Sequence, residues 1–570
     1  MDPVRLAVLK GRLEQIADEM DATLYRSAFN PIIAEAHDAS HGLYDADTGD
    51  TLVQGKSGLP VFVGAMAFAV RAAIEAARAD GGLRDGDVWI FNDPYDGGTH
   101  LNDFKLVRPF FHDGRLFCCL ASVAHWHDVG GAVPGNYNPA ATECWQEGML
   151  IPPVRLIREG RQIPEVLAIL QANSRLPGSV YGDLNGQLAA LDLGVRRLGA
   201  LLDEYGADTV RAALQALRER AVTMMRRHIL DLPAGDYHCE DFLDNDGIVD
   251  APLRIAVRIG VDHGDARRPP RLALDFTGTA PACAGPVNIS RSTAIAACYV
   301  ALKHCFADVP ANAGVLDAID FTIDENSLIS ARKPAPVGGY TETILRMIDV
   351  IFGALAKADP KHATAMAYGT INALSIAGTR SEGPDRGRPW VMFSFFGGGH
   401  GAHPAGDGLS HGNAPISMAT IPPLEILEAS YPVAFTRWSL RPDSAGDGEH
   451  RGGLGAIYEI ELLEKDARAF VFGERGRFAP KGVVGGAEAA CNEIGFSIDG
   501  QWRHPPMVSK QVGVTMSRGD RVRIATPGGG GWGDPGRRAS SARARDRLLG
   551  YVGEDESPEM HERAAARDAR

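Results

Sequence analysis

The sequence lacks the features of a disulfide-rich protein, a membrane protein and a secreted protein. Its 570 residues include eight cysteines, and no two of them form a Cys-x-x-Cys pair. A disulfide framework is therefore not expected, and a reducing cytoplasm fits this cysteine usage. Apolar runs stop well short of the roughly 18 residues that cross a bilayer. The first residues, MDPVRLAVLKGRLEQ, lack the architecture of a signal peptide. We expect a cytoplasmic protein that does not associate with membranes.

Positive charge is in short supply. The chain has 58 lysines and arginines against 72 aspartates and glutamates, which gives a formal net charge of −14. An acidic surface repels the phosphates of nucleic acids and of anionic lipids. Neither nucleic acid nor a membrane surface is therefore expected as a partner.

A nucleotide-binding loop is also missing. The run FGGGHG at 396–401 is not followed by the Lys-Ser or Lys-Thr of a P-loop. Two further stretches, DGGT at 96–99 and DVGG at 128–131, echo the phosphate loops of actin-like ATPases. Neither lies near the N-terminus between hydrophobic strands, as such a loop requires. We expect no ATP site in this chain.

What the chain does have is a concentration of possible metal ligands in residues 92–131. His100 and Asp103 lie three residues apart at the start of an apolar run. The segment HDGR at 112–115 reads as a hairpin turn, and the return run leads to His125. Two antiparallel strands would bring the three residues to the same end of one hairpin. Two imidazoles and a carboxylate are the ligand set expected for catalytic zinc, manganese or iron.

The residues around these ligands add to the prediction. Glycine pairs at 97–98 and 130–131 flank them and allow close approach of the backbone. His127 and Asp128 follow in the next turn, either as groups that orient the ligands or as a catalytic acid/base pair. A simpler interpretation stays open, because a few loop-placed His and Asp residues occur by chance in many soluble proteins.

Hydrophobic periodicity predicts the main elements. Apolar residues at steps of three and four predict an amphipathic helix at 4–29, and further helices are expected at 64–79 and between 164 and 227. The part of the chain after 456 has strand character. Residues 537–570 are charged with few large apolar groups, so we expect this tail to be disordered.

Several separated blocks together resemble one known family. They are NDPYDGGTHLND (92–103), AHWHDVGG (124–131), EGMLIPPVRL (147–156), FTGTAPACAGPVN (276–288), PVGGYTETILRMIDVIFGALAKA (336–358) and WSLRPDSAGDGEHRGGLG (438–455). The chain resembles the hydantoinase B/oxoprolinase family over nearly all of residues 2–536. This family includes the B subunits of ATP-dependent hydantoinases, the matching half of 5-oxoprolinases, lactam hydrolases and the metal-bearing subunit of acetone carboxylases.

The resemblance implies a fold and a division of the chain. We expect a mixed α/β or α+β fold of the hydantoinase B type, built from several lobes within residues 1–536. A metal-bearing lobe is expected at about 1–235, a mixed α/β lobe at 236–430 and a β-rich lobe at 431–536.

The resemblance also implies a metal site. A zinc, manganese or iron ion is expected at the positions matching His100, Asp103 and His125. Asp38 is a fourth candidate ligand.

The resemblance extends to a helix start at about 341. Glu342, Thr343 and Arg346 match the family pattern there and are candidates for substrate binding. The alternative is that they simply cap and fill a buried helix. Two residues depart from the pattern: Phe62 stands where a histidine is usual, and Tyr340 where an amide residue is frequent. These departures point to a different substrate preference.

A chemistry and a partner follow from the same resemblance. Hydantoins and lactams are unreactive amides, and in this family an actin-like ATPase, the A subunit, phosphorylates the ring oxygen. The chain is expected to be the B subunit of a hetero-oligomer, in which it hydrolyses the activated cyclic amide while ATP acts only through the partner. Two alternatives stay open: the metal-bearing subunit of an ATP-dependent ketone carboxylase, and a non-catalytic scaffold for the ATPase.

Overall fold

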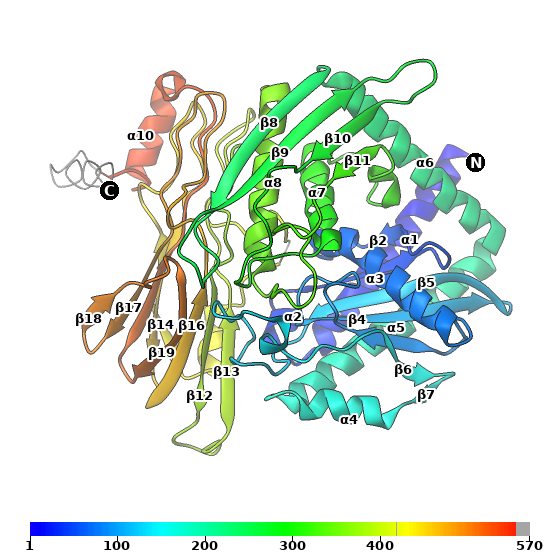
Figure 1. Cartoon of the computed structure of the whole chain (residues 1–570), viewed down its shortest axis with the longest axis horizontal. Helices are drawn as coiled ribbons and strands as arrows, with labels where there is room; N and C mark the ends of the chain where they lie inside the picture. The colour runs from blue at the N-terminus through cyan, green and yellow to red at the C-terminus, as the bar shows by residue number, and fades with distance from the viewer. Residues whose placement is uncertain (418, 554–570) are drawn as a thin grey trace.

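A computed structural model describes residues 1–417 and 419–553. Figure 1 shows an N-terminal sheet in blue, a central region of green helices and strands, and C-terminal sheets in yellow to orange on the opposite side. Helices and several sheets alternate through the chain. The expected mixed α/β fold is confirmed.

The N-terminal sheet is antiparallel throughout and has the strand order β2-β1-β5-β4-β3-β6-β7. Its strands are β1 (Ala39–Tyr44), β2 (Thr51–Gln54), β3 (Val88–Phe91), β4 (Asp103–His112), β5 (Arg115–His125), β6 (Val154–Arg158) and β7 (Arg161–Gln162). Alternate residues of β4 enter different cores, Phe104 on one face and Val107 on the other. Both faces of the central strands are therefore covered, which explains why β4 and β5 are apolar on both sides.

Six helices belong to this part of the chain: α1 (Pro3–Ser27), α2 (Pro31–Ala34), α3 (Pro60–Ala79), α4 (Pro164–Ala172), α5 (Pro177–Tyr205) and α6 (Ala207–Asp231), with a short 3-10 turn at Cys144–Gln146. The side chain of Asp2 caps α1 by accepting a hydrogen bond from the backbone of Arg5. Leu13 and Met20 are fully buried on the face that meets α5. The predicted amphipathic helix is therefore present and serves core packing.

The second sheet has the order β11-β10-β9-β8 and packs on the central helix α8, which in turn packs on α7. These elements are β8 (Gly235–Leu243), β9 (Leu253–Asp262), β10 (Arg271–Asp275), α7 (Arg291–Cys305), β11 (Ile319–Thr322) and α8 (Tyr340–Ala358), with a 3-10 turn at Ala313–Val315. A Cβ atom on Gly64 of α3 would lie 2.6 Å from the Cα atom of Ala296 in α7. This close approach locks the N-terminal region onto the centre of the molecule.

Two antiparallel sheets form the C-terminal part, with the orders β13-β12-β16-β19 and β14-β15-β20-β17-β18. Its elements are β12 (Ala373–Thr379), β13 (Pro389–Ser394), α9 (Leu424–Ser430), β14 (Val433–Leu440), β15 (Ala456–Leu462), β16 (Asp466–Phe472), β17 (Glu493–Ile498), β18 (Gln501–Arg503), β19 (Lys510–Ser517) and β20 (Arg521–Ala525). One core contains residues of both sheets, including Val471 and Ile524. Because β12 and β13 pair into this unit, its first sheet crosses the lobe boundary expected near 430.

The glycine-rich runs form a feature of their own, here called the glycine bundle: residues 397–401, 446–455, 482–487 and 526–533. Its extended segments are joined by backbone hydrogen bonds, such as Gly529 N–H to Gly453 O at 2.9 Å. A Cβ atom on Gly529 would lie 1.9 Å from the carbonyl oxygen of His400. Glycine is needed here because backbone packs directly on backbone.

The first part of the tail that was expected to be disordered, residues 537–553, is ordered in the structure. After a 3-10 turn at Pro535–Arg537, helix α10 (Ser540–Leu548) packs back onto the molecule. Asp546 pairs with Arg538 at 2.7 Å and with Arg451 at 3.4 Å, and these ion pairs hold the helix in place. The rest of the expected tail, 554–570, lies outside the described residues.

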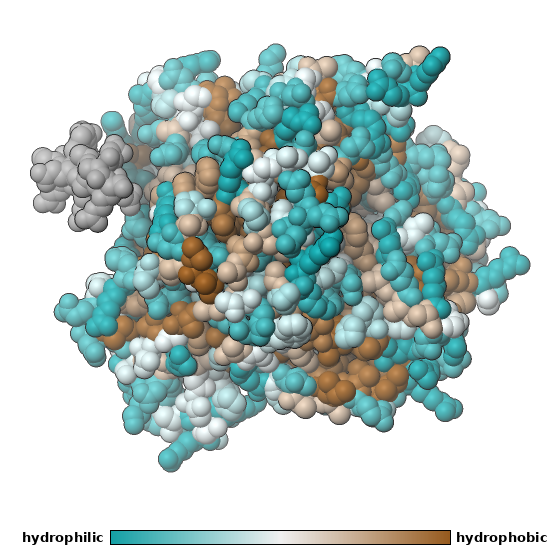
Figure 2. Space-filling model, viewed as in Figure 1, coloured by the Kyte–Doolittle hydropathy of each residue, from teal (hydrophilic) through white to brown (hydrophobic). Residues whose placement is uncertain are grey.

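The surface in Figure 2 is largely hydrophilic, with hydrophobic residues gathered near α4. Ile169 of that helix is 52% exposed. Within the part of the chain that the structure describes, no helix combines the length and apolar character needed to cross a membrane.

Candidate metal centre

The hairpin of β4 and β5 places the predicted ligands as the sequence suggests. Asp103 pairs directly with His125, and His112 with Arg115 at the other end. Asp113 and Gly114 form the tight turn with φ of 49° and 72°. Two successive positive φ values are typical of the type I′ turn that matches the twist of a hairpin.

His100, Asp103 and His125 form one buried cluster. Their ligand atoms all lie within 4.8 Å of one another. The Nε2 atom of His100 is 3.1 Å from Oδ1 of Asp103, and Nδ1 of His125 is 3.6 Å from the same oxygen. Each residue is at most 2% exposed.

The donor atoms of this cluster fit a metal ion. Among the described residues, His100 Nε2, Asp103 Oδ1 and His125 Nε2 are buried without a hydrogen-bond partner. Buried polar atoms without partners are rare in folded proteins, and a metal ion would satisfy them. Burial alone would raise the pKa of Asp103, but the two imidazoles hold it well below its usual range. The carboxylate is therefore in the form that binds a cation.

Asp38 lies beside this cluster. Its Oδ2 atom is 3.8 Å from Nδ1 of His125, and its backbone oxygen accepts a hydrogen bond from the His125 N–H. Burial raises the pKa of Asp38 to about 7, although His125 acts in the opposite direction. The structure thus brings the fourth candidate ligand to the edge of the cluster.

Aromatic side chains close the site. The ring of Tyr340 lies 4.7 Å from that of His100, and Phe393 stacks on His125 at 5.5 Å. The ring of Tyr137 lies 4.9 Å from that of Phe393 and 5.6 Å from that of His100. The three rings come from α8, β13 and the loop after β5, and the sequence alone could not show that they meet.

Backbone contacts hold the ligand-bearing loops. Asn102 donates from Nδ2 to the Trp126 oxygen at 2.8 Å, and Asn30 donates to the His125 oxygen at 2.9 Å. Trp126 is fully buried and stacks on Phe104 at 3.8 Å. These contacts therefore hold the segments that carry the candidate ligands in place.

His127 and Asp128 have different surroundings. His127 is buried, its Nε2 atom has no partner within the described part of the chain, and burial lowers its pKa to about 4. Asp128 accepts hydrogen bonds from the backbones of Gly130, Gly135 and Arg175 and from the Arg175 side chain. These contacts occupy both oxygens of Asp128 in holding a loop, whereas His127 has one ring nitrogen, Nε2, without a partner among the described residues. A catalytic role for either residue stays a prediction.

The start of α8 is held by a residue that the sequence analysis did not select. Glu147 accepts hydrogen bonds from the backbones of Val337 at 2.9 Å and Gly338 at 2.6 Å. Burial raises the pKa of Glu147 to about 8. Glu147 lies inside the block 147–156 and next to a glycine, and this position is the sequence signal that could have identified it.

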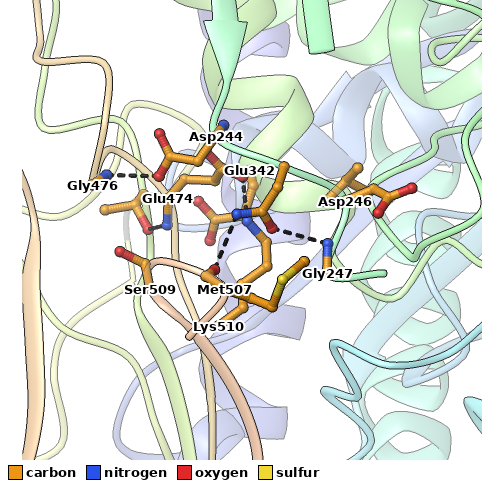
Figure 3. Close-up of polar contacts among 12 residues, drawn as sticks. Asp244, Asp246, Gly247, Glu342, Glu474, Gly476, Met507, Ser509 and Lys510 are labelled. Atoms are coloured by element: carbon orange, nitrogen blue, oxygen red, sulfur yellow. Dashed lines mark hydrogen bonds and ion pairs between the residues drawn. The ribbon is translucent and has the colours of Figure 1, made fainter. Parts of the chain in front are cut away.

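Glu342 points into a polar joint with the C-terminal part, where Figure 3 draws it near Glu474 and Lys510. Its Oε1 atom accepts a hydrogen bond from the Ile371 backbone at 3.2 Å, while Oε2 has no partner in the described region. Burial and the nearby charge of Glu474 raise its pKa to about 8.

Thr343 and Arg346 make scaffold contacts. Thr343 donates to the Val287 oxygen, and Arg346 donates to Asp241 at 3.1 Å and to the Phe242 oxygen at 2.8 Å. Both are fully buried. Their contacts join α8 to neighbouring segments; substrate binding by Glu342, Thr343 or Arg346 stays a prediction.

Lys105 is a second residue that the sequence analysis missed. It lies two positions after Asp103 on β4, on the same face of the strand, and is only 1% exposed. Burial lowers the pKa of Lys105 to about 8, against the raising effect of Asp103 and Asp93. A lysine within an otherwise buried strand was the signal that could have identified it.

Comparison with known proteins decides the family. The sequence profile of hydantoinase B/oxoprolinase matches residues 2–535. The chain belongs to the hydantoinase B/oxoprolinase family. It is 32% identical to the caprolactamase subunit beta of Pseudomonas jessenii over 97% of this chain and 95% of that protein.

Solved structures agree with this assignment. The crystal structure of ATP-dependent caprolactamase from Pseudomonas jessenii has a TM-score of 0.83 and 30% identity, covering 97% of this chain and 95% of the other. The nucleotide-free structure of acetone carboxylase has a TM-score of 0.88 at 20% identity, covering 97% of this chain and 78% of the other. The second similarity concerns the hydantoinase B fold alone.

Proposed function

We propose that this chain is the B-type subunit of an ATP-dependent cyclic-amide hydrolase. It would open a hydantoin, 5-oxoproline or lactam ring after an ATPase partner has phosphorylated the ring oxygen. The observation that carries the proposal is the buried cluster of His100, Asp103 and His125, with donor atoms that lack partners in the described chain. The name and near full-length match of the caprolactamase subunit support the choice of substrate class.

The residues of the cluster would hold a zinc, manganese or iron ion, with Asp38 beside it. When bound, such an ion supplies Lewis acidity toward a carbonyl group or a water molecule. Tyr137, Tyr340 and Phe393 would exclude bulk water from the reacting ring, which limits side reactions. His127 offers an imidazole nitrogen without a partner in the described residues for accepting or returning a proton. Asp128 would position it by fixing the loop.

The first experiment compares His100→Ala with His112→Ala in the chain co-expressed with a hydantoinase A-type ATPase. His112 is a matched control because its imidazole pairs, within the described residues, with the exposed carboxylates of Asp203 at 3.0 Å and Asp113 at 3.6 Å. Bound metal and ATP-dependent ring opening are measured. We expect His100→Ala to lose the metal and more than about 100-fold of the rate, and His112→Ala to keep both.

Other results of this experiment would favour a different function for the chain. Full metal content and full rate in His100→Ala would refute the metal-centre proposal. ATP turnover that requires a ketone and bicarbonate would assign the chain to the carboxylases instead. Ring opening by a metal-free complex, unchanged by loss of His100, would leave the chain as a scaffold for the ATPase.

A further inference from the structure

One buried cation beside the candidate metal centre, Lys105, has no counterion among the residues that the structure describes. Within this part of the chain its Nζ atom makes a single hydrogen bond, to the Asn92 oxygen at 3.5 Å, which is at the outer limit of such a bond. No carboxylate lies within 4.0 Å of it in the described residues, although ion pairs of other lysines are found there. A lysine ammonium offers three donors. Most of its donor capacity is therefore unused.

The nearby carboxylates are already engaged. Asp93 pairs with Lys333 at 2.8 Å. Asp103 faces His100 and accepts a hydrogen bond from the Thr99 hydroxyl. Both carboxylates therefore have closer partners than Lys105, on which they act only from beyond ion-pair distance.

The position of the ammonium is set by the turn that leads to the metal ligands. A Cβ atom on Gly98 would lie 2.5 Å from Nζ of Lys105. Gly98 itself is fixed, because its carbonyl oxygen accepts a hydrogen bond from Thr293 at 2.8 Å. The glycine thus leaves room for the lysine to sit beneath the turn, next to the site.

Burying a charge without a partner is costly, and such a charge is expected to have a partner that the chain does not supply. A divalent metal at the cluster would add further positive charge on the same side of β4. With such a metal bound, the net charge around Lys105 would be positive, and an anionic oxygen would be attracted to it.

We propose that Lys105 binds an anionic group of the substrate at the metal centre. This inference rests on the proposed function, which it narrows to substrates that carry a carboxylate or arrive as a phosphorylated intermediate. A neutral lactam ring alone would leave Lys105 unpaired.

The test uses the full-length, metal-loaded chain without its ATPase, so that it is independent of ring opening. Binding of 5-oxoproline, 2-pyrrolidinone and inorganic phosphate is measured by calorimetry for the wild type, Lys105→Met and Lys56→Met. The first two probes share one ring and differ only in the carboxylate. Lys56 is a control because its side chain is 73% exposed.

We expect Lys105→Met to weaken binding of one anion by about 10-fold or more, and Lys56→Met to change nothing. Loss confined to 5-oxoproline identifies a substrate carboxylate. Loss confined to phosphate identifies the phosphoryl group of the activated intermediate. Unchanged affinity for both anions, or a wild type that binds neither, overturns the inference.

A second readout separates binding from a structural role. Removing an unpaired buried charge should leave the melting temperature of Lys105→Met equal to or above that of the wild type. A lower melting temperature with unchanged anion affinity would show that Lys105 only secures the turn at 93–98. Should the variant not fold, a wild-type crystal structure with each anion decides: an oxygen within hydrogen-bond distance of Nζ supports the inference, and an anion bound elsewhere refutes it. Failure of ring opening in the complex would not affect any of these measurements.

Discussion

At the scale of single residues, the site is surrounded by carboxyl groups in unequal environments. Glu147 and Glu342 both flank the start of α8, and burial raises the pKa of each to about 8. They differ in their contacts. Glu147 uses both oxygens as acceptors for backbone N–H groups, whereas Glu342 uses one and leaves the other without a partner in the described chain. Glu147 and Glu342 therefore have similar pKa values but different hydrogen-bonding roles.

This difference predicts opposite effects of the same substitution. Glu342→Gln keeps the one acceptor and replaces a protonated oxygen, so it should be neutral or stabilising. Glu147→Gln sets an amide N–H against a backbone N–H and should cost about 1–3 kcal/mol of unfolding free energy. Urea unfolding at pH 7 measures both. Equal losses in the two variants would contradict the assignment of contacts.

The pH dependence of Glu342→Gln has a definite sign. Unfolded glutamate releases its proton near its ordinary value of 4.5, while folded Glu342 keeps it up to about 8. Wild-type stability from this group is thus present below pH 4.5 and lost as the pH rises through 8. The variant lacks this term, so its advantage in melting temperature should grow between pH 5 and 8. A constant difference across this range would show that Glu342 is ionised throughout.

At the scale of elements, the local sequence pattern predicts the helices and the β4–β5 hairpin. It does not predict contacts between residues that are far apart in the sequence. The hairpin of β4 and β5 follows from two apolar runs and the turn residues between them, so the proximity of His100, Asp103 and His125 could be inferred from sequence. The aromatic closure could not, because Tyr340 and Phe393 reach the site from elements far along the chain. The unpaired state of Lys105 could not be predicted from the sequence, because only the structure shows that no carboxylate of the described residues lies within 4.0 Å of its Nζ atom.

The C-terminal tail is a second example of a long-range contact that the sequence does not predict. Composition alone predicts disorder from 537 onward, because few large apolar groups are present. Helix α10 is instead held by the ion pairs of Asp546 with Arg451 and Arg538. Arg451 lies far from the tail in sequence, and composition cannot show that Asp546 pairs with it.

The glycine bundle gives a prediction at this scale. Gly529→Ala would place a methyl group 1.9 Å from a carbonyl oxygen, and the backbone on both sides would have to separate. Gly406→Ala is the control, since a Cβ atom there meets nothing within 4 Å. We expect Gly529→Ala to lose most of its soluble, folded protein and Gly406→Ala to behave as wild type, judged by yield and thermal melting. Equal behaviour of the two would mean that the segments of the bundle are not in direct contact.

At the scale of the whole molecule, one buried arginine joins the C-terminal part to the centre. Arg475 follows β16 and is fully buried. It donates to Asp241 of β8 at 2.8 Å and also pairs with Asp349 of α8. Three segments distant in sequence thus meet at one guanidinium. One of them is α8, whose first residue, Tyr340, lies against His100 of the candidate metal cluster.

The last prediction tests this junction. Arg475→Met leaves Asp349 without the guanidinium and weakens the neutralisation of Asp241, so it should cost about 3–5 kcal/mol of unfolding free energy. The matched control is Arg268→Met, because Arg268 pairs with Asp265 on an exposed hairpin and such pairs contribute about 0–1 kcal/mol. Urea midpoints of the full chain give the comparison. If the metal cluster depends on this junction, metal affinity should fall with stability in Arg475→Met alone; a destabilised variant with wild-type metal affinity would show instead that the hairpin of β4 and β5 holds the site by itself.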